Sequence, residues 1–238
     1  MNGYPLVSIV IPTFNCPYIA YAIESALNQS YPRTEVIVVN DGSTKYIEKI
    51  KPYFNKIKYI EKNNGGTGSA LNTGIKHAHG EYFTWLSSDD LYDSNKVSKQ
   101  VAFMRSVGAY ASYTACYHIN EKNIITRRSG VGYPTKSKFY KAMLQGNVIN
   151  GCTVMLRKTV FDKVGIFNES LRCTQDYDLW CRILQHFDFH YLDVPLVSYR
   201  IHSQMGTKKL GNVIATERTL IQQKYKEVLK RLINQGNR

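Results

Sequence analysis

Residues 7–11 read VSIVI, a nearly continuous run of β-branched side chains. Such runs are typical of strands that are buried on both faces, as in parallel sheets. Residues 35–40, EVIVVN, repeat this pattern, and residues 18–28 between them carry apolar side chains at helical spacing. A strand, a helix and a second buried strand in this order predict a parallel βαβ unit.

The alternation continues along the chain and predicts the α/β fold class, with a Rossmann-like, mostly parallel central sheet flanked by helices. We expect further strands over residues 57–61, 81–86, 110–118, 153–158, 188–193 and 195–202. We expect further helices over residues 47–54, 66–78, 95–107 and 176–187. After residue 206 the chain predicts a basic amphipathic helix, with one apolar stripe formed by Ile214, Ile221, Tyr225, Val228 and Leu232.

The composition is that of a globular protein. The chain has 238 residues, of which 43% are hydrophobic and 21% are charged, so a disordered, collagen-like or coiled-coil chain is excluded. The formal net charge is +13, and residues 204–238 supply +6 of it. The remaining positive charge, carried by residues 1–203, suits a polyanionic ligand or an anionic surface. Because no zinc-finger, RRM or KH motif occurs, we expect no nucleic-acid partner.

The chain is expected to be cytoplasmic. No apolar run approaches the roughly 18 residues of a spanning helix, and Pro12 interrupts the N-terminal run too soon for a signal peptide. Five scattered cysteines without a C-x-x-C pair agree with a reducing compartment. The basic tail allows peripheral membrane contact, packing on a second copy, or packing on the chain's own core, and the last of these is favoured.

Polar clusters follow three of the expected strands: PTFN at 12–15, NDGS at 40–43 and SSDD at 87–90. Ligands of open α/β sheets bind beyond the carboxyl ends of the strands, so these clusters predict one pocket. The carboxylates of Asp89 and Asp90 suit Mg²⁺ or Mn²⁺, which bridge to phosphates. Alternatively, either carboxylate caps the next helix, and Asp41 is only a turn residue before Gly42.

Residues 66–71, GTGSAL, begin like a dinucleotide fingerprint but have Leu71 in place of the third glycine. The motif also follows the third strand rather than the first, which argues against a nicotinamide-dependent oxidoreductase. No P-loop motif occurs.

Six strings together resemble the successive motifs of the family 2 glycosyltransferases, which are nucleotide-sugar enzymes of the GT-A fold. These strings are VSIVIPTFN (7–15), VIVVNDGST (36–44), NNGGTGSALNTGI (63–75), FTWLSSDD (83–90), TQDYDLW (174–180) and YRIH (199–202). The resemblance spans residues 6–202. It implies an inverting transferase that takes a nucleotide sugar, with a UDP-sugar favoured, and uses Mn²⁺ or Mg²⁺.

The resemblance also implies roles for single residues. The nucleotide-binding set is Pro12, Thr13, Asn15, Asp41, Gly66, Ser69, Ser87 and Ser88. Asp89 matches the metal-binding position of the Asp-x-Asp motif, and His202 joins the metal or is a core histidine. Asp90 and Arg200 are candidates for diphosphate or substrate contact. The chain departs from the family at Ser87 and Leu71, where an aspartate and an arginine are usual.

The family's catalytic base corresponds here to Asp176, in the pair Gln175-Asp176. The alternative is a first-turn acid that the helix dipole favours. Asp178 is expected to be structural, and Trp180 to pack in the core behind the base. Residues 127–151, with Arg127, Arg128 and Tyr133, are expected on the acceptor side.

We therefore expect one domain over residues 1–205, with a nucleotide-binding half (1–90) and an acceptor-side half (91–205), followed by a helical tail (206–238). The expected acceptor is a glycan, a lipid or a protein, and a homodimer through the tail is an open alternative. The competing interpretation is a nucleotide-sugar or nucleic-acid binding protein without transferase activity.

Overall fold

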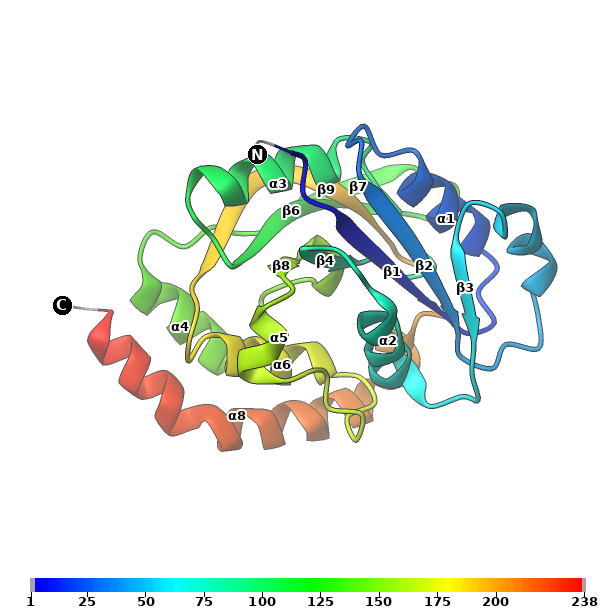
Figure 1. Cartoon of the computed structure of the whole chain (residues 1–238). Coiled ribbons are helices and arrows are strands. Elements are labelled where there is room, and N and C mark those ends of the chain that lie inside the picture. The colour runs from blue at the N-terminus through cyan, green and yellow to red at the C-terminus, as the bar shows by residue number, and fades with distance from the viewer. Residues whose placement is uncertain (1–2, 237–238) are drawn as a thin grey trace.

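The computed structural model describes residues 3–236, which form one curled α/β sheet with helices packed around it (Figure 1). The strands are β1 (Val7–Thr13), β2 (Thr34–Asn40), β3 (Lys58–Glu61), β4 (Tyr82–Trp85), β5 (Leu91–Tyr92), β6 (Ala111–Ile119), β7 (Ile125–Ser129), β8 (Met155–Arg157) and β9 (Phe189–Arg200). The α-helices are α1 (Ile19–Leu27), α2 (Gly66–His77), α3 (Lys96–Ser106), α4 (Lys136–Gln145), α5 (Val160–Val164), α6 (Gln175–Ile183), α7 (Gly206–Lys209) and α8 (Gly211–Gln235).

The parallel half of the sheet is built from β3, β2, β1 and β4, in that spatial order. Strand β1 pairs in parallel with β2 on one side and with β4 on the other. All seven residues of β1 are buried, because helices cover the sheet. The predicted α/β class and the predicted βαβ unit are therefore confirmed, and the carboxyl ends of β1, β2 and β4 meet at one edge.

The other half of the sheet is mixed. Strand β8 runs antiparallel to both β4 and β6, and β9 runs parallel to β6. Strand β5 pairs with β9 at one end of the sheet, and β7 pairs with β6. Because β6 and β9 point the same way as β4, the end of β9 reaches the edge where the polar clusters lie.

Two expectations about local structure are wrong. The two strands expected over residues 188–193 and 195–202 are a single strand, β9 (Phe189–Arg200), because its pairing with β6 continues past Asp193 and Pro195 through shifts of register. The short helix expected over residues 47–54 is instead two 3₁₀ turns, Ile47–Lys49 and Lys51–Tyr53. Strands β5 and β7 and helices α4 and α5 have no counterpart among the elements that the sequence predicts.

Helix α8 lies along α4 and α6 at the lower margin of the molecule in Figure 1. Its inward face repeats every four residues and consists of Glu217, Ile221, Tyr225, Leu229 and Ile233. Of the predicted stripe, Ile221 and Tyr225 are buried, whereas Ile214, Val228 and Leu232 are only half-buried. The tail helix thus packs on the chain's own helices, while a dimer or a membrane contact through it stays a prediction. Within residues 3–236, no helix has the length and apolar character needed to cross a membrane.

Candidate active site

The loop after β1 is joined to the loop after β2 through Asn15. Its backbone N–H donates to Ser43 Oγ at 3.0 Å, and its Oδ1 accepts the N–H groups of Thr44 and Lys45, both at 2.9 Å. Asn15 has a φ of 49°, a left-handed conformation that asparagine tolerates better than most residues. Pro12 and Thr13 are buried as the last two residues of β1, so they form the floor beneath this loop.

Asp41, at the end of β2, anchors the glycine turn that begins α2. Its Oδ1 accepts hydrogen bonds from Lys62 Nζ at 2.8 Å and Gly65 N at 3.0 Å, and its Oδ2 accepts one from Gly66 N at 2.8 Å. Gly66 has a φ of 85°, which favours glycine at this position. The carboxylate is 3% exposed, so in this state it organises the turn rather than facing solvent.

Ser69 lies half-buried in the first turn of α2, close after the anchored glycine. Hydrogen bonds from Asn72 and then from Ser69 lower the pKa of Glu169. The start of α2 is therefore tied to the segment before α6 as well as to β2.

Asp90 fastens the loop after β4 to two distant segments. Its Oδ1 accepts the backbone N–H of Arg200 at 2.8 Å, and its Oδ2 accepts the thiol of Cys152 at 3.2 Å. Burial and the neighbouring charge of Asp89 raise the pKa of Asp90. Because the side chain is fully buried and both oxygens are engaged, its position does not fit the expected direct contact with a diphosphate.

Ser87 and Ser88 remain half-buried on the same loop. The hydroxyl of Ser87 lies 3.1 Å from Cys152 Sγ, and the carbonyl of Ser88 accepts the thiol of Cys16 at 3.3 Å. Both serines therefore keep part of their surface exposed, and the buried thiols of Cys152 and Cys16 contact the loop from its inner side.

Asp89 and His202, the two expected metal ligands, lie together. Asp89 Oδ2 is 2.9 Å from His202 Nε2, and the edge of the Tyr18 ring supports the imidazole, with ring centroids 5.3 Å apart. Arg200, the last residue of β9, also contacts this loop, because its Nε donates to the carbonyl of Asp89 at 2.7 Å.

Arg200 is fully buried beneath this pair. Its guanidinium lies over the ring of Tyr18, 4.5 Å from the centroid, and Nη1 donates to the carbonyl of Asn120 at 3.1 Å. Within the described residues its Nη2 has no hydrogen-bond partner. Arg200 thus connects the turn between β6 and β7 to the loop that carries Asp89, and its Nη2 is the guanidinium donor that these contacts do not use.

The residues present fit a divalent cation that also binds a ligand's phosphates. A carboxylate oxygen and an imidazole nitrogen at hydrogen-bond distance are a donor pair suited to Mn²⁺ or Mg²⁺. Over residues 3–236, no cluster of three or more His, Cys, Asp or Glu side chains is arranged to hold a metal. A cation held by this pair would take its other ligands from phosphate oxygens and water.

Asp176 is the second residue of α6 and is half-buried. Its Oδ1 accepts the N–H of Tyr177 at 2.7 Å, and its Oδ2 accepts a hydrogen bond from Asn147 Nδ2 at 2.8 Å. Burial raises the pKa of Asp176 from 3.8 to about 6. A carboxylate with this pKa is ionised at neutral pH and basic enough to accept a proton.

The neighbours of Asp176 on α6 are structural, as expected. Asp178 accepts hydrogen bonds from Arg182, Lys224 and Tyr225, each at 2.9 Å, and is buried. Trp180 is fully buried and stacks on Trp85 at the end of β4, with ring centroids 5.9 Å apart.

Residues 147–152 connect the two parts of the site. Asn147 contacts Asp176, and Cys152 contacts Asp90 beside Asp89. Gln175, the first residue of α6, packs against Gly68 of α2. A Cβ added at Gly68 would lie 3.6 Å from Gln175 Cγ. The ends of β1, β2, β4 and β9 and the start of α6 therefore surround one region.

Sequence reasoning missed Asn147 and the hydrogen bonds that Cys152 makes with Asp90 and Ser87. No local pattern marks Asn147, because an exposed asparagine just beyond the end of a helix is common in loops. Cys152 also carries no local signal, since its partners lie 62 and 65 residues away.

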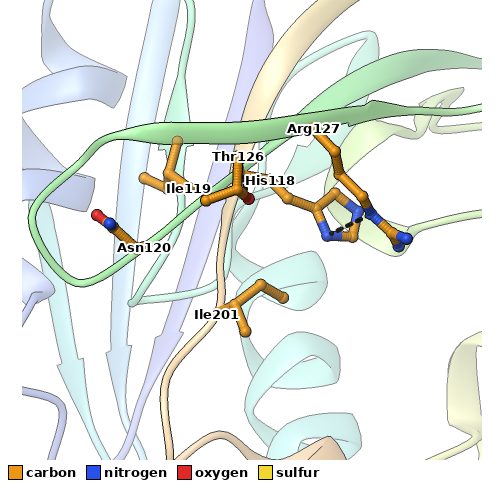
Figure 2. Close-up of a pocket in the computed structure, with 6 residues that line it drawn as sticks. All are labelled: His118, Ile119, Asn120, Thr126, Arg127 and Ile201. Carbon is orange, nitrogen blue, oxygen red and sulfur yellow. Dashed lines mark hydrogen bonds between the residues drawn. The ribbon is translucent and has the colours of Figure 1, made fainter.

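Two hollows in the surface lie elsewhere. One of about 400 Å³ is lined by His118, Ile119, Asn120, Thr126, Arg127 and Ile201 (Figure 2). Arg127 Nε donates to His118 Nδ1 at 3.3 Å there, and burial with the Arg127 charge lowers the pKa of His118. Ile201 lines this hollow, whereas its chain neighbours Arg200 and His202 do not.

The second hollow has a volume of about 380 Å³. It is lined by residues from 132–140, at the start of α4, and by residues 188–191, at the start of β9, and Tyr133 is one of its aromatic residues. Arg128 forms an ion pair with Asp193 nearby. Neither hollow contains Asp89 or Asp176, and the expected acceptor-side role of residues 127–151 stays a prediction.

The family model described as glycosyl transferase family 2 matches residues 8–165. An uncharacterised glycosyltransferase of Rickettsia felis is 41% identical over 225 residues, which cover 89% of this chain and 37% of the relative. The chain thus spans little more than a third of that relative's length. The UDP-Glc:alpha-D-GlcNAc-diphosphoundecaprenol beta-1,3-glucosyltransferase WfaP of Escherichia coli is 35% identical over 187 residues, which cover 75% of this chain and 70% of WfaP.

Among solved structures, the mannosyltransferase PcManGT from Pyrobaculum calidifontis, in complex with GDP-Man and Mn²⁺, superposes with a TM-score of 0.68. The match covers 96% of this chain and 65% of the other, with 17% sequence identity. At that identity the likeness shows the fold alone, which is the expected GT-A fold.

Proposed function

The chain belongs to glycosyl transferase family 2, and from that premise we propose that it transfers a sugar, with inversion, from a UDP-sugar to an acceptor hydroxyl. The observation that carries the proposal is the environment of Asp176. A half-buried carboxylate with a pKa of about 6 lies at the start of α6, on a segment joined through residues 147–152 to the loop of Asp89. This arrangement supports a base on one side of a site whose other side binds a diphosphate.

In the proposed reaction, the acceptor oxygen attacks the anomeric carbon of the donor sugar. The new carbon–oxygen bond forms as the bond to the diphosphate oxygen breaks, and UDP leaves with that electron pair. Asp176 accepts the proton of the acceptor hydroxyl. Asn147, which donates to Asp176 Oδ2, fixes the direction of the carboxylate and leaves lone pairs for the incoming hydroxyl.

We assign the nucleotide to the ends of β1, β2 and β4. Pro12, Thr13 and Asn15 line the first loop, and Asp41 holds the glycine turn so that Gly66 and Ser69 lie at the amino end of α2. Asp41 already accepts the N–H of Gly66, and beyond it the first turn of a helix offers N–H groups and a favourable dipole to an anion. Ser87 and Ser88 offer hydroxyls to the ribose, in place of the charged aspartate that is usual in the family.

Asp89 and His202 are the residues that would hold Mn²⁺ or Mg²⁺. When bound, the cation supplies positive charge that stabilises the leaving diphosphate. Asp90 and Arg200 support this pair from beneath, because they fix the loop and the end of β9 to each other. The presence of Mn²⁺ in the PcManGT complex supports this assignment.

We propose that the acceptor is a sugar hydroxyl of a lipid-diphosphate-linked glycan, and the similarity to the Escherichia coli glucosyltransferase WfaP supports this choice. The test incubates the full chain with Mn²⁺, UDP-glucose or UDP-N-acetylglucosamine, and a short-chain GlcNAc-diphosphate lipid. Acceptor-dependent UDP release together with a lipid product that gains one hexose or one N-acetylhexosamine supports the proposal. Tight UDP binding without any such product, across a panel of glycan, lipid and protein acceptors, contradicts it and favours a binding protein.

A further inference from the structure

Glu217 of α8 is bound to the loop that precedes α6. Its Oε1 accepts the backbone N–H of Arg172 at 2.7 Å, and its Oε2 accepts those of Cys173 at 3.0 Å and Thr174 at 3.1 Å. The hydroxyl of Thr174 also donates to Oε2, at 2.9 Å. One carboxylate, itself 8% exposed, therefore satisfies three consecutive N–H groups and a hydroxyl.

These contacts replace the usual cap of α6. Thr174 is the N-cap residue, yet its side chain makes no capping hydrogen bond within α6 because its hydroxyl is committed to Glu217. The conformation of the loop at 172–174 thus depends on a residue more than forty positions later in the chain. Asp176 lies two residues beyond the end of this loop.

The same helix also contacts the segment that carries the partner of Asp176. Gln222 Nε2 donates to the carbonyl of Gln145 at 2.8 Å, at the end of α4 and two residues before Asn147. Helix α8 is further fixed to α6 by Tyr225, which donates to Asp178 at 2.9 Å. A single helix therefore connects the segment of Asn147 to the segment of Asp176.

From this geometry we propose that Glu217 is a positioning residue for Asp176, and that α8 sets how the Asp176 carboxylate faces Asn147 and the acceptor. The inference rests on the proposed function, in which Asp176 is the general base. It also assigns the tail helix a role within the reaction, since α8 supplies the carboxylate that binds the loop at 172–174.

The charged and titratable groups around Asp176 are few. The thiols of Cys173, on the loop, and Cys181, on α6, both sense its charge, and their own pKa values are raised by burial. The carboxylate of Asp176 contacts the neutral side chain of Asn147, which lies in the segment after α4. From α8, the acid Glu217 contacts the loop that precedes Asp176. The raised pKa of Asp176 is due to burial, so it depends on the loop's keeping water from the carboxylate.

The test is a carbon-13 NMR titration of the aspartate carboxyls in the full chain, with Asp176→Asn used to assign the Asp176 signal. Without Glu217, the loop loses its hydrogen bonds and the carboxylate becomes hydrated. We expect Glu217→Ala to lower the pKa of Asp176 by about one unit. Glu217→Gln keeps one accepting oxygen but turns an amide N–H toward the loop, so the pKa of Asp176 in this variant should lie between those in wild type and Glu217→Ala.

The matched control is Glu227→Ala, which removes an exposed acid of the same helix whose side chain pairs with Lys230. It should leave the pKa of Asp176 at the wild-type value. Circular dichroism confirms that each variant is folded, and Glu217→Gln serves if Glu217→Ala fails to fold. An unchanged pKa in a folded Glu217 variant overturns the inference.

In transfer assays, misplacing the base should lower kcat by roughly tenfold while the KM for the donor stays unchanged, because the donor binds to the other half of the sheet. A fall in donor affinity with kcat unchanged would also overturn the positioning role. Failure of the proposed function has a different signature. In that case the wild-type chain itself forms no transfer product, and if Asp176 is not the base, Asp176→Asn still transfers sugar, whatever the Glu217 variants do to the pKa.

Discussion

His202 Nε2 lies 2.9 Å from Asp89 Oδ2, although the two residues are 113 positions apart in the chain. Asp90 is the cause of this proximity, because it binds the backbone N–H of Arg200 and so fixes the end of β9 to the loop after β4. Asp90 thereby places His202, two residues beyond Arg200, beside Asp89.

The first prediction concerns this pair. Asp89→Ala and His202→Ala should each weaken the Mn²⁺-dependent part of UDP binding by roughly 10–100-fold, because each removes one of two protein donors. Isothermal titration of UDP with and without Mn²⁺ measures this part directly. The control is His186→Ala, an exposed histidine just beyond the end of α6. Equal enhancement by Mn²⁺ in wild type and Asp89→Ala would contradict the assignment.

The second prediction follows from the raised pKa of Asp176. The folded protein binds this proton more tightly than the unfolded chain does, since the pKa rises from 3.8 to about 6 on folding. The stabilising contribution of the protonated carboxyl is full below pH 3.8 and is lost as the pH rises through about 6. Relative to wild type, Asp176→Asn should therefore gain in Tm between about pH 4.5 and pH 7.5. A Tm difference that is the same at both pH values would show that the carboxyl is not perturbed.

The third prediction concerns Asp41. Asp41→Ala leaves the N–H groups of Gly65 and Gly66 without their acceptor and removes the ion pair with Lys62. It should reduce the free energy of unfolding by roughly 1–3 kcal/mol and weaken UDP binding, because the glycine turn loses its anchor. Denaturant unfolding and UDP titration measure the two effects, with the exposed Asp162→Ala as control. Wild-type UDP affinity in Asp41→Ala would exclude the turn from the nucleotide site.

The fourth prediction tests whether the tail is part of the folded domain. Leu229 is fully buried between α8 and its neighbours, whereas Leu220 on the same helix is 56% exposed. Leu229→Ala should reduce the free energy of unfolding by about 2–5 kcal/mol. Leu220→Ala should change it by less than about 0.5 kcal/mol. Similar small effects of both substitutions would show that α8 folds separately and is free to bind elsewhere.

The sequence predicted the parts of the fold whose local pattern is strong. The runs at 7–11 and 35–40 are buried on both faces, so their continuous apolar character is a direct consequence of their position in the sheet. By contrast, β7 is almost entirely exposed and carries no alternation that could reveal it. Strand β9 resembles two strands in the sequence because Pro195 suggests a break, and only the pairing with β6 shows that the strand continues.

The candidate site divides in the same way. Asp89, His202 and Asp176 stand at strand ends or at a helix start, where position along the chain already predicts position in space. Asn147 and Glu217 act across long separations and carry no motif, so their contacts with Asp176 and its loop emerge only from the packing of α4 and α8.

The most direct test of the account is the transfer rate of Asp176→Asn, with the exposed Asp162→Asn as the control substitution of the same type. Asparagine keeps the shape of the side chain but cannot accept a proton. We expect Asp176→Asn to bind UDP and Mn²⁺ as wild type does and to lose transfer by at least a factor of about 10². Wild-type transfer should also rise with pH through about 6. Wild-type turnover by Asp176→Asn, with the same pH dependence, would contradict the account at its centre.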